Sequence, residues 1–268
     1  MPASSKDQKT GKPGKVTLGY WANIRGIVEP IRYMLEYAGV PYEYKTYPWL
    51  DKPTAQESKA VWLEEKAALA ERGLAFPNLP YLVDGEETKI VQSLAIMRYL
   101  ARKHGLAVPD SKPAEAARVD MLEAQINELR RVDVVAELMP FETLVVPDLL
   151  LLGGLLRVPE REFSRGPARA SGAAVAKPRR PHVACWGSDH HVDFMLYELL
   201  DQFSLFKPGC LDEHANLTAY VDRFRQLKPI KAYLSSDRFQ PWPVFLPLAK
   251  RWGSGKPPAN LVGKQAKA

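Results

Sequence analysis

The order of strand-like and helix-like segments between residues 16 and 104 constrains the fold of this chain more than any other feature. Short β-rich runs alternate with segments that repeat apolar residues every three or four positions, as one face of a helix does. Strands are expected at 16–20, 42–47, after Pro80 to Asp84, and 88–91, and helices at 27–38, 61–72 and 93–103. Asp84-Gly85 predicts a hairpin turn, and Ser93 is expected to cap the last helix. The order β-α-β-(α)-β-β-α predicts a small α/β domain with a mixed sheet. This order of elements is thioredoxin-like.

The rest of the chain has a helical pattern, with one exception. Residues 105–113 are expected to be a linker, and a helical domain is expected over 114–253, clearest at 118–138, 193–206 and 215–227. Residues 1–15 and 254–268 are expected to be disordered tails. The pattern is lost over 139–190, where 163–181 carries five basic residues and no acidic one. Such a stretch buries too little apolar surface to offset its ordering entropy, so it is expected to be a disordered insertion or an out-of-frame or misspliced stretch.

Composition limits the function classes. The 268 residues carry 37 Lys and Arg against 31 Asp and Glu, and the resulting +6 is too mild to indicate nucleic-acid binding. Two cysteines exclude a disulfide framework and favour a reducing compartment. No apolar run approaches the roughly 20 residues of a membrane helix, so we expect a cytoplasmic protein with no membrane partner. The histidines and acidic groups near Cys185 (His182, Asp189, His190 and His191) match no familiar zinc spacing, and no metal is expected.

Several residues of the first domain could carry chemistry, and each also has a purely structural interpretation. Tyr20 ends the first strand. Its side chain is either a half-buried packing residue or the source of a hydroxyl that donates a hydrogen bond to a developing anion. A cis peptide bond before Pro80 would turn the Leu79 backbone outward to pair with a peptide-like ligand, although trans is the default. Gln92-Ser93 is either an ordinary helix start or a carboxylate site. Trp62 and Lys66, four apart on one helix face, could hold a second carboxylate, although such a pair is more often surface packing.

Taken together these segments resemble a cytosolic glutathione S-transferase, most closely of the mu class. The resemblance rests on LGYW (18–21), IRG (24–26), WLEEK (62–66), FPNLPYL (76–82), QS (92–93) and RYLARKHG (98–105), and later on VDF (192–194), KPGCLD (207–212) and PVF (243–245). It implies a thioredoxin-like domain that binds glutathione and a helical domain that supplies the electrophile pocket. It also implies an enzyme that joins the glutathione thiolate to hydrophobic electrophiles, with glutathione as co-substrate and no other cofactor.

The resemblance also assigns roles. Tyr20 would donate to the glutathione sulfur, and the partner subunit of a homodimer would contribute Asp120. Trp21, Trp62, Lys66, Asn78, Leu79, Pro80, Gln92 and Ser93 would bind glutathione; Ile27, Arg130 and Phe245 would line the electrophile pocket; Phe76 and Arg98 would lie at the dimer interface.

The chain departs from the family pattern in places that bear on the electrophile. Ala22-Asn23 adds a residue after Trp21, the stretch 128–131 lacks the hydroxyl side chain common in the pocket, and Leu246 replaces a usual Ser. The family caps its buried helix with Thr, and His190 occupies that position here. Two alternatives stay open: a non-catalytic ligand-binding or structural protein on the same fold, and a glutathione-dependent isomerase that uses the same thiolate.

Overall fold

A computed structural model describes residues 15–135, 189–249, 252–253, 257–258 and 261 of the chain. Three expected irregular regions lie largely outside the described residues: the N-terminal tail at 1–15 except for Lys15, the irregular stretch at 139–190 except for its last two residues, and most of the tail at 254–268. His182 and Cys185 also lie outside the described residues.

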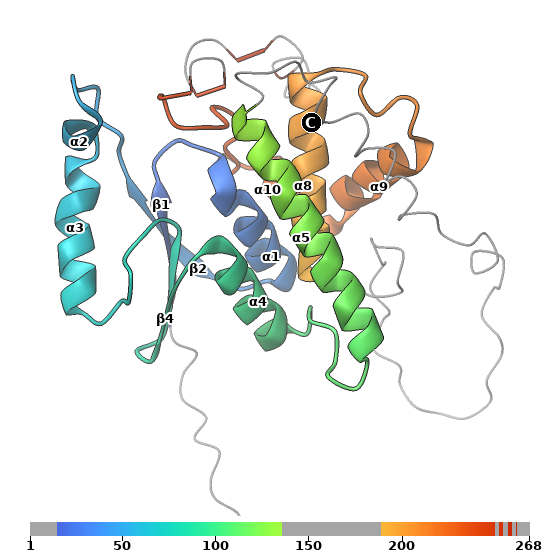
Figure 1. Ribbon diagram of the computed structural model, residues 1–268, viewed down its shortest axis with the longest axis horizontal. Helices are drawn as coiled ribbons and strands as arrows, with labels where there is room; N and C mark the ends of the chain where they lie inside the picture. Colours follow the sequence, from blue (N-terminus) through green and yellow to red (C-terminus); the bar gives the residue numbers. More distant parts are fainter. Residues whose placement is uncertain (1–14, 136–188, 250–251, 254–256, 259–260, 262–268) are drawn as a thin grey trace, which may run out of the picture. The chain divides into compact units, whose positions relative to one another are not determined.

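A four-stranded mixed sheet forms the first part of the chain (Figure 1). Its strands are β1 (Val16–Trp21), β2 (Tyr42–Tyr47), β3 (Tyr81–Asp84) and β4 (Thr88–Val91). They lie in the order β2-β1-β3-β4, with β1 and β2 parallel and the other neighbours antiparallel. The mixed sheet and the 84–85 hairpin expected from the sequence are both confirmed.

Helices account for most of the remaining described residues. They are η1 (Gly26–Val28), α1 (Glu29–Ala38), α2 (Ala55–Ser58), α3 (Ala60–Glu71), α4 (Ser93–His104), α5 (Pro113–Val135), α8 (His191–Phe206), α9 (Ala215–Gln226) and α10 (Lys228–Leu234). The short α2 lies in a stretch that composition predicts to be a loop. It forms because Thr54 and Glu57 make a reciprocal capping box, in which each side chain accepts a hydrogen bond from the other residue's backbone N–H.

The start of α4 differs from the expectation that Ser93 is its N-cap. Ser93 is the first helical residue, and the Gln92 carbonyl accepts the N–H of Ile96 at 3.0 Å. Gln92 has a φ of +73°, in the left-handed region that a non-glycine side chain seldom adopts. The turn into α4 is therefore held in a costly conformation, of a kind that concentrates at functional sites.

The chain divides into two compact units, and their boundary differs from the one the sequence suggests. Residues 40–96 group with the chain up to residue 22, whereas residues 23–39 group with 97–268. The reason is that α1 packs on α8 and α10 through aromatic contacts, such as Tyr33 against Tyr197 of α8 at 5.3 Å and against Tyr233 of α10 at 5.9 Å. Thus α1, which precedes β2 in sequence, belongs by its contacts to the helical unit.

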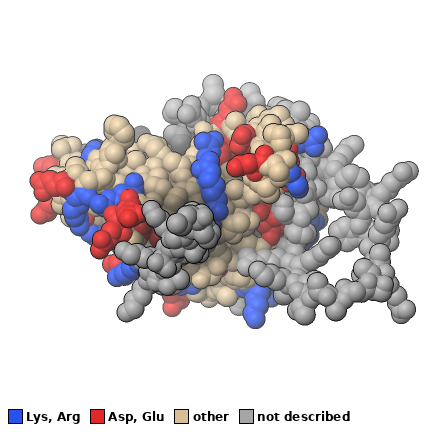
Figure 2. All heavy atoms as spheres, turned by 90° about the horizontal axis from the view of Figure 1, so that it is seen from below, with Lys and Arg blue, Asp and Glu red and all other residues tan. Residues whose placement is uncertain are grey.

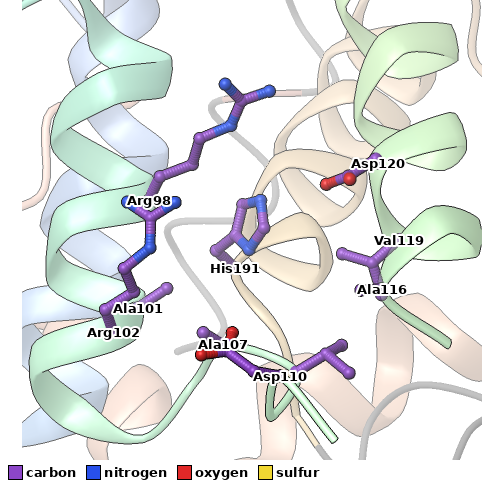
Figure 3. A pocket seen from close by; sticks show the side chains of 10 residues that line it. Arg98, Ala101, Arg102, Ala107, Asp110, Ala116, Val119, Asp120 and His191 are labelled. Atoms are coloured by element: carbon purple, nitrogen blue, oxygen red, sulfur yellow. The ribbon is translucent and has the colours of Figure 1, made fainter. Parts of the chain in front are cut away.

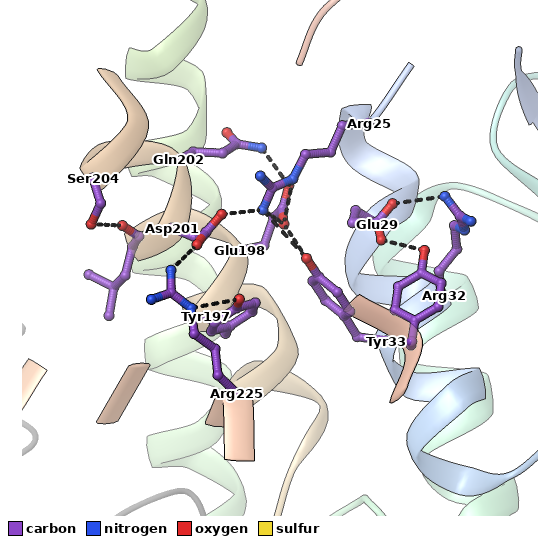
Figure 4. Close-up of polar contacts among 12 residues, drawn as sticks. Arg25, Glu29, Arg32, Tyr33, Tyr197, Glu198, Asp201, Gln202, Ser204 and Arg225 are labelled. Atoms are coloured by element: carbon purple, nitrogen blue, oxygen red, sulfur yellow. Dashed lines mark hydrogen bonds and ion pairs between the residues drawn. The ribbon is translucent and has the colours of Figure 1, made fainter. Parts of the chain in front are cut away.

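A fully buried arginine ties the segment before α1 to α8 (Figure 4). The Arg25 guanidinium donates to Glu198 Oε2 at 2.6 Å and to Asp201 Oδ2 at 2.8 Å. Burial opposes its charge, but Glu198, Tyr33 and Asp201 outweigh that effect and raise the pKa of Arg25. Removing one member of such a buried pair costs about 3–5 kcal/mol because the other charge is left unpaired.

The start of α8 is buried and carries half of a capping box. His190 occupies the N-cap position, and the Asp193 carboxylate accepts its backbone N–H at 2.8 Å. The Tyr220 hydroxyl donates to the Asp193 carbonyl at 2.7 Å, next to the same carboxylate. Burial raises the pKa of Asp193 from 3.8 to about 8.

The buried Asp193 predicts that stability falls as pH rises. The folded chain keeps this carboxyl protonated up to about pH 8, whereas the unfolded chain loses the proton near pH 4. Between these values the folded state binds more protons, so the free energy of unfolding decreases with increasing pH. Urea unfolding from pH 5 to 8 should therefore show a shallower decrease for Asp193→Asn than for the unmodified protein. Asp222→Asn, an exposed change on α9, is the control, and equal slopes in the unmodified protein and Asp193→Asn would contradict the prediction.

Candidate functional site

The register of the sheet brings three separate sequence segments to one end of the first unit. Gly19 pairs with Tyr81, and Tyr81 pairs with Val91. Tyr20 follows Gly19, Pro80 precedes Tyr81 in the antiparallel strand, and Gln92 follows Val91. These three residues, which the sequence proposes for separate reasons, therefore meet at the same end of the sheet.

Gly19 allows this register because there is no space for a side chain. A Cβ at Gly19 would lie 2.0 Å from the ring of Tyr81, which packs directly over the strand. The Tyr81 hydroxyl lies 2.7 Å from that of Tyr47 on β2, and both tyrosines are buried. Burial and this hydrogen bond raise the pKa of Tyr47, so the pair stays neutral and acts as a rigid support. The sequence analysis did not find this pair; the single Gly in β1 was its only signal.

An aromatic cluster surrounds the Trp21 end of β1. The Trp21 ring meets Trp49 edge-on at 5.4 Å and Trp62 at 6.4 Å, and Trp62 meets Tyr47 at 5.2 Å. Trp21 and Trp62 are buried. The cluster thus fixes α3, which carries Trp62, beside the end of β1 and β2. Trp49 was not among the residues singled out from the sequence.

Lys66 lies one helical turn after Trp62 and is exposed. The neighbouring Glu65 is already paired, because Lys45 contacts it at 2.7 Å and Arg72 at 2.6 Å. Burial favours the protonated acid, but these two hydrogen bonds outweigh it and lower the pKa of Glu65. Within the described part of the chain, Lys66 makes no hydrogen bond or ion pair. Its ammonium is therefore available to an anionic ligand.

The segment before β3 exposes backbone and amide groups. The Leu79-Pro80 peptide bond is cis, as the resemblance implies. Asn78 is exposed, and its Oδ1 accepts the Leu79 N–H at 2.9 Å. Ser93, at the start of α4, is half-buried. The Leu79 N–H is thus already satisfied within the chain by the neighbouring Asn78 side chain.

Two of the three residues expected in an electrophile pocket lie near one another in the helical unit. Gly26, next to Ile27, donates its N–H to the Val244 carbonyl at 2.9 Å, and Phe245 follows directly. The Phe245 ring lies 6.1 Å from Phe206. Arg130 is half-buried on α5.

Asn23 shows how the added residue after Trp21 is accommodated. Its φ of +56° is left-handed, a conformation that Asn tolerates better than most residues. Arg25, two residues later, donates its backbone N–H to the Pro243 carbonyl at 2.9 Å, which fixes the end of the loop.

The residues expected at a subunit interface are exposed to different degrees. Phe76 is 86% exposed and has a φ of +51°. Arg98 is part-exposed and binds Glu123 with two guanidinium nitrogens, with Nε 3.0 Å from Oε2. Asp120 is exposed on α5 and contributes to the electrostatic stabilisation of Arg98.

Three further observations concern membrane spans, metal ligands and surface charge. No helix there is long and apolar enough to cross a membrane, and the described residues contain no group of three His, Cys, Asp or Glu that could hold a metal. On the face shown in Figure 2, acidic and basic side chains are interspersed.

Comparison with known proteins identifies the family. Residues 16–102 match the family model of the glutathione S-transferase N-terminal domain, and residues 191–237 match that of a C-terminal domain. The chain is 40% identical to glutathione S-transferase Mu 3 of Mus musculus over 89% of its own length and 99% of that protein. It is also 40% identical to Mu 1 of Rattus norvegicus, over 87% and 96%.

Solved structures agree with this assignment. The glutathione S-transferase Blo t 8 superposes with a TM-score of 0.65 at 28% identity, covering 89% of this chain and all of that one. A pi-class enzyme of Onchocerca volvulus gives 0.60 at 25% identity, covering 82% and 91%. The chain belongs to the glutathione S-transferase family, and its relatives at 40% identity are of the mu class. It is a glutathione transferase, and no observation supports the non-catalytic alternative.

Proposed function

We propose that the end of the sheet where Tyr20, Pro80 and Gln92 meet is the glutathione site, and that Tyr20 activates the thiol for attack on hydrophobic electrophiles. The β1–β3–β4 register carries this proposal, because it brings together three segments that the sequence singles out as candidates for separate reasons. The left-handed Gln92 supports it, since strained backbone concentrates at binding sites.

The chemistry requires a thiolate at neutral pH. A free thiol has a pKa near 8.5, so only a few per cent is ionised at pH 7. Lowering that pKa by about two units corresponds to roughly 2.7 kcal/mol of differential stabilisation. Tyr20 is buried at the end of β1, and a fixed hydroxyl donor in a partly dry site supplies stabilisation of this kind.

The remaining groups match the ends of glutathione. Lys66 and the Trp62 indole would hold the glycyl carboxylate, with Trp21 packed behind them. Asn78 and the Leu79 backbone would pair with the peptide. Gln92 and Ser93 would take the γ-glutamyl end, helped by Asp120 of a second copy. Glutathione is then the co-substrate, with no metal required.

The electrophile would contact Ile27, Arg130 and Phe245. Ile27 is 41% exposed and Phe245 is half-buried, so both offer apolar surface. This favours hydrophobic electrophiles.

Cys210 is a free thiol, in keeping with a reducing, cytoplasmic environment.

The chain is proposed to act as a homodimer through Phe76 and Arg98. A large aromatic ring that is 86% exposed in a left-handed backbone conformation is costly in an isolated chain. Insertion into a second copy would remove that ring from water.

Tyr20→Phe tests the thiol activation. It removes the hydroxyl donor and keeps the ring, so turnover should fall roughly a hundredfold, as when one donor to a developing anion is removed. Glutathione binding should change little. An aryl-halide conjugation assay measures turnover, and the pH dependence of kcat/KM should shift upward by about two units. Unchanged turnover and an unchanged pH profile would exclude Tyr20 from this role.

Lys66→Ala tests the carboxylate contact. Losing the available ammonium should weaken glutathione binding by about tenfold at low salt, corresponding to about 1.4 kcal/mol. The effect should shrink at high salt, because the contact is exposed. Calorimetric titration with glutathione measures it, with Lys59→Ala at the N-cap of the same helix as the control. Equal affinities for the two variants would contradict the assignment.

Phe76→Ser tests the dimer. The ring is almost fully exposed, so its loss should leave the folding of one chain intact and weaken self-association at least tenfold. Sedimentation velocity over a concentration series measures the association. Leu248→Ser, which removes another exposed apolar side chain, should have no such effect. A dimer of unchanged affinity in Phe76→Ser would refute this interface.

A further inference from the structure

Three buried aromatic rings of the first unit contact one another around Trp62. Tyr47 on β2, Trp62 on α3 and Tyr81 on β3 are 3%, 4% and 1% exposed. The Trp62 ring meets Tyr47 edge-on at 5.2 Å and lies nearly parallel to Tyr81, at 6.4 Å and with 19° between the planes. Trp62 therefore packs against two tyrosines that belong to different strands.

A single hydrogen bond joins the two tyrosines. Their hydroxyl oxygens lie 2.7 Å apart, and among the residues that the structure describes neither hydroxyl has another hydrogen-bond partner. Burial raises the pKa of both tyrosines, so both hydroxyls stay protonated, with one donating and the other accepting. Removal of either hydroxyl would leave a buried polar group without its partner, which is costly.

The strands fix the backbone end of each tyrosine. Tyr47 pairs with Trp21 across the β1–β2 ladder, and its carbonyl accepts the Ala22 N–H at 2.8 Å. The Tyr81 ring packs over Gly19, where there is no room for a side chain. Because the hydroxyl bond then fixes the far ends of both rings, the two tyrosines present a rigid surface to Trp62.

Trp62 in turn determines where Lys66 lies. Of the 12 residues of α3, only Trp62 and Leu69 are buried, so Trp62 is the main anchor of the first half of this helix. Lys66 follows Trp62 by four residues and thus lies on the same face, one turn along the helix. A displacement of the Trp62 ring would therefore also move the Lys66 ammonium.

We propose that the Tyr47–Tyr81 hydroxyl pair positions the glycyl end of glutathione, by holding Trp62 and, through α3, Lys66. This inference rests on the glutathione site proposed above, in which Trp62 and Lys66 hold the glycyl carboxylate. Tyr47 and Tyr81 are then positioning residues, because their hydroxyls bond to each other. The pair should increase the preference for glutathione over γ-glutamylcysteine, which has the same thiol and γ-glutamyl group but lacks the glycine.

The other end of glutathione depends on different residues. Gln92 and Ser93 are proposed to take the γ-glutamyl group, with Asp120 of a second copy. Asp120 lines a cavity of the helical unit together with Arg98, one of the residues proposed for the subunit interface (Figure 3). Within the described chain, no hydrogen bond or ring contact joins the tyrosine pair to these side chains, so the effect of the pair should be confined to the glycyl end.

The test compares Tyr47→Phe, Tyr81→Phe and the double variant by calorimetric titration with glutathione and with γ-glutamylcysteine. Each single change should weaken glutathione binding about fivefold, as expected for the loss of one hydrogen bond, and γ-glutamylcysteine binding by no more than about twofold. The double variant should lose no more than either single variant, because the two hydroxyls act as one unit. In aryl-halide conjugation the loss should appear in KM for glutathione, with kcat retained.

Tyr220→Phe is the matched control, because it removes a buried, hydrogen-bonded hydroxyl from α9 in the helical unit. It should leave both affinities unchanged. Equal weakening of the two ligands, no weakening of either, or additive losses in the double variant would overturn the proposal. If the unmodified protein did not prefer glutathione, the proposed carboxylate contact would fail and this inference with it, whereas a preference that all three variants keep would refute this inference alone.

Discussion

The close approach of Tyr81 to Gly19 is the constraint on which the proposed glutathione end of the sheet depends. Because a Cβ at Gly19 would lie 2.0 Å from the tyrosine ring, β1 and β3 can pair in this way only where one strand lacks a side chain. That pairing determines which residues extend past the last rung of the ladder, and these are Tyr20, Pro80 and Gln92. A slip of one residue would reverse the face of every side chain on β3. The chemistry proposed for Tyr20 thus depends on the absence of a side chain at the preceding residue, Gly19.

In the helical unit, a cluster of buried charges around Arg25 determines how the elements are placed. Arg25 and its carboxylate partners are held by at least two hydrogen bonds each, and Gln202 adds another to Glu198 at 2.6 Å. Such a network is weak evidence for net stability, since removing ions from water is costly. The network instead specifies the position of α8, because the guanidinium fits one arrangement of α8 against the segment before α1. The same segment holds Pro243 and Val244 through its backbone.

Much of this could be predicted from the sequence, and the exceptions share a physical cause. Period-two and period-3.6 patterns are local, so they located the strands and nearly all helices, and the order of elements predicted the mixed sheet. Contacts distant in sequence leave no such pattern, so the assignment of α1 to the helical unit and the Tyr47–Tyr81 pair were missed. The left-handed Gln92, which displaced the cap expected at Ser93, was missed because nothing in a Gln-Ser pair signals a positive φ. The functional roles of all the proposed site residues, from Tyr20 to Asp120 and Arg130, stay predictions.

The residues proposed to activate glutathione and those proposed to contact the electrophile are held in place by different interactions. Tyr20 and Trp21 belong to a strand whose neighbours on both sides fix its register, and a change there disturbs the ladder. Phe245 belongs to an irregular segment that is positioned by backbone hydrogen bonds, from Gly26 to Val244 and from Phe245 to the Trp252 carbonyl at 3.2 Å. Backbone bonds tolerate side-chain substitution. The departure at Leu246, which follows Phe245 directly, therefore changes a side chain without removing the backbone hydrogen bonds that position this segment.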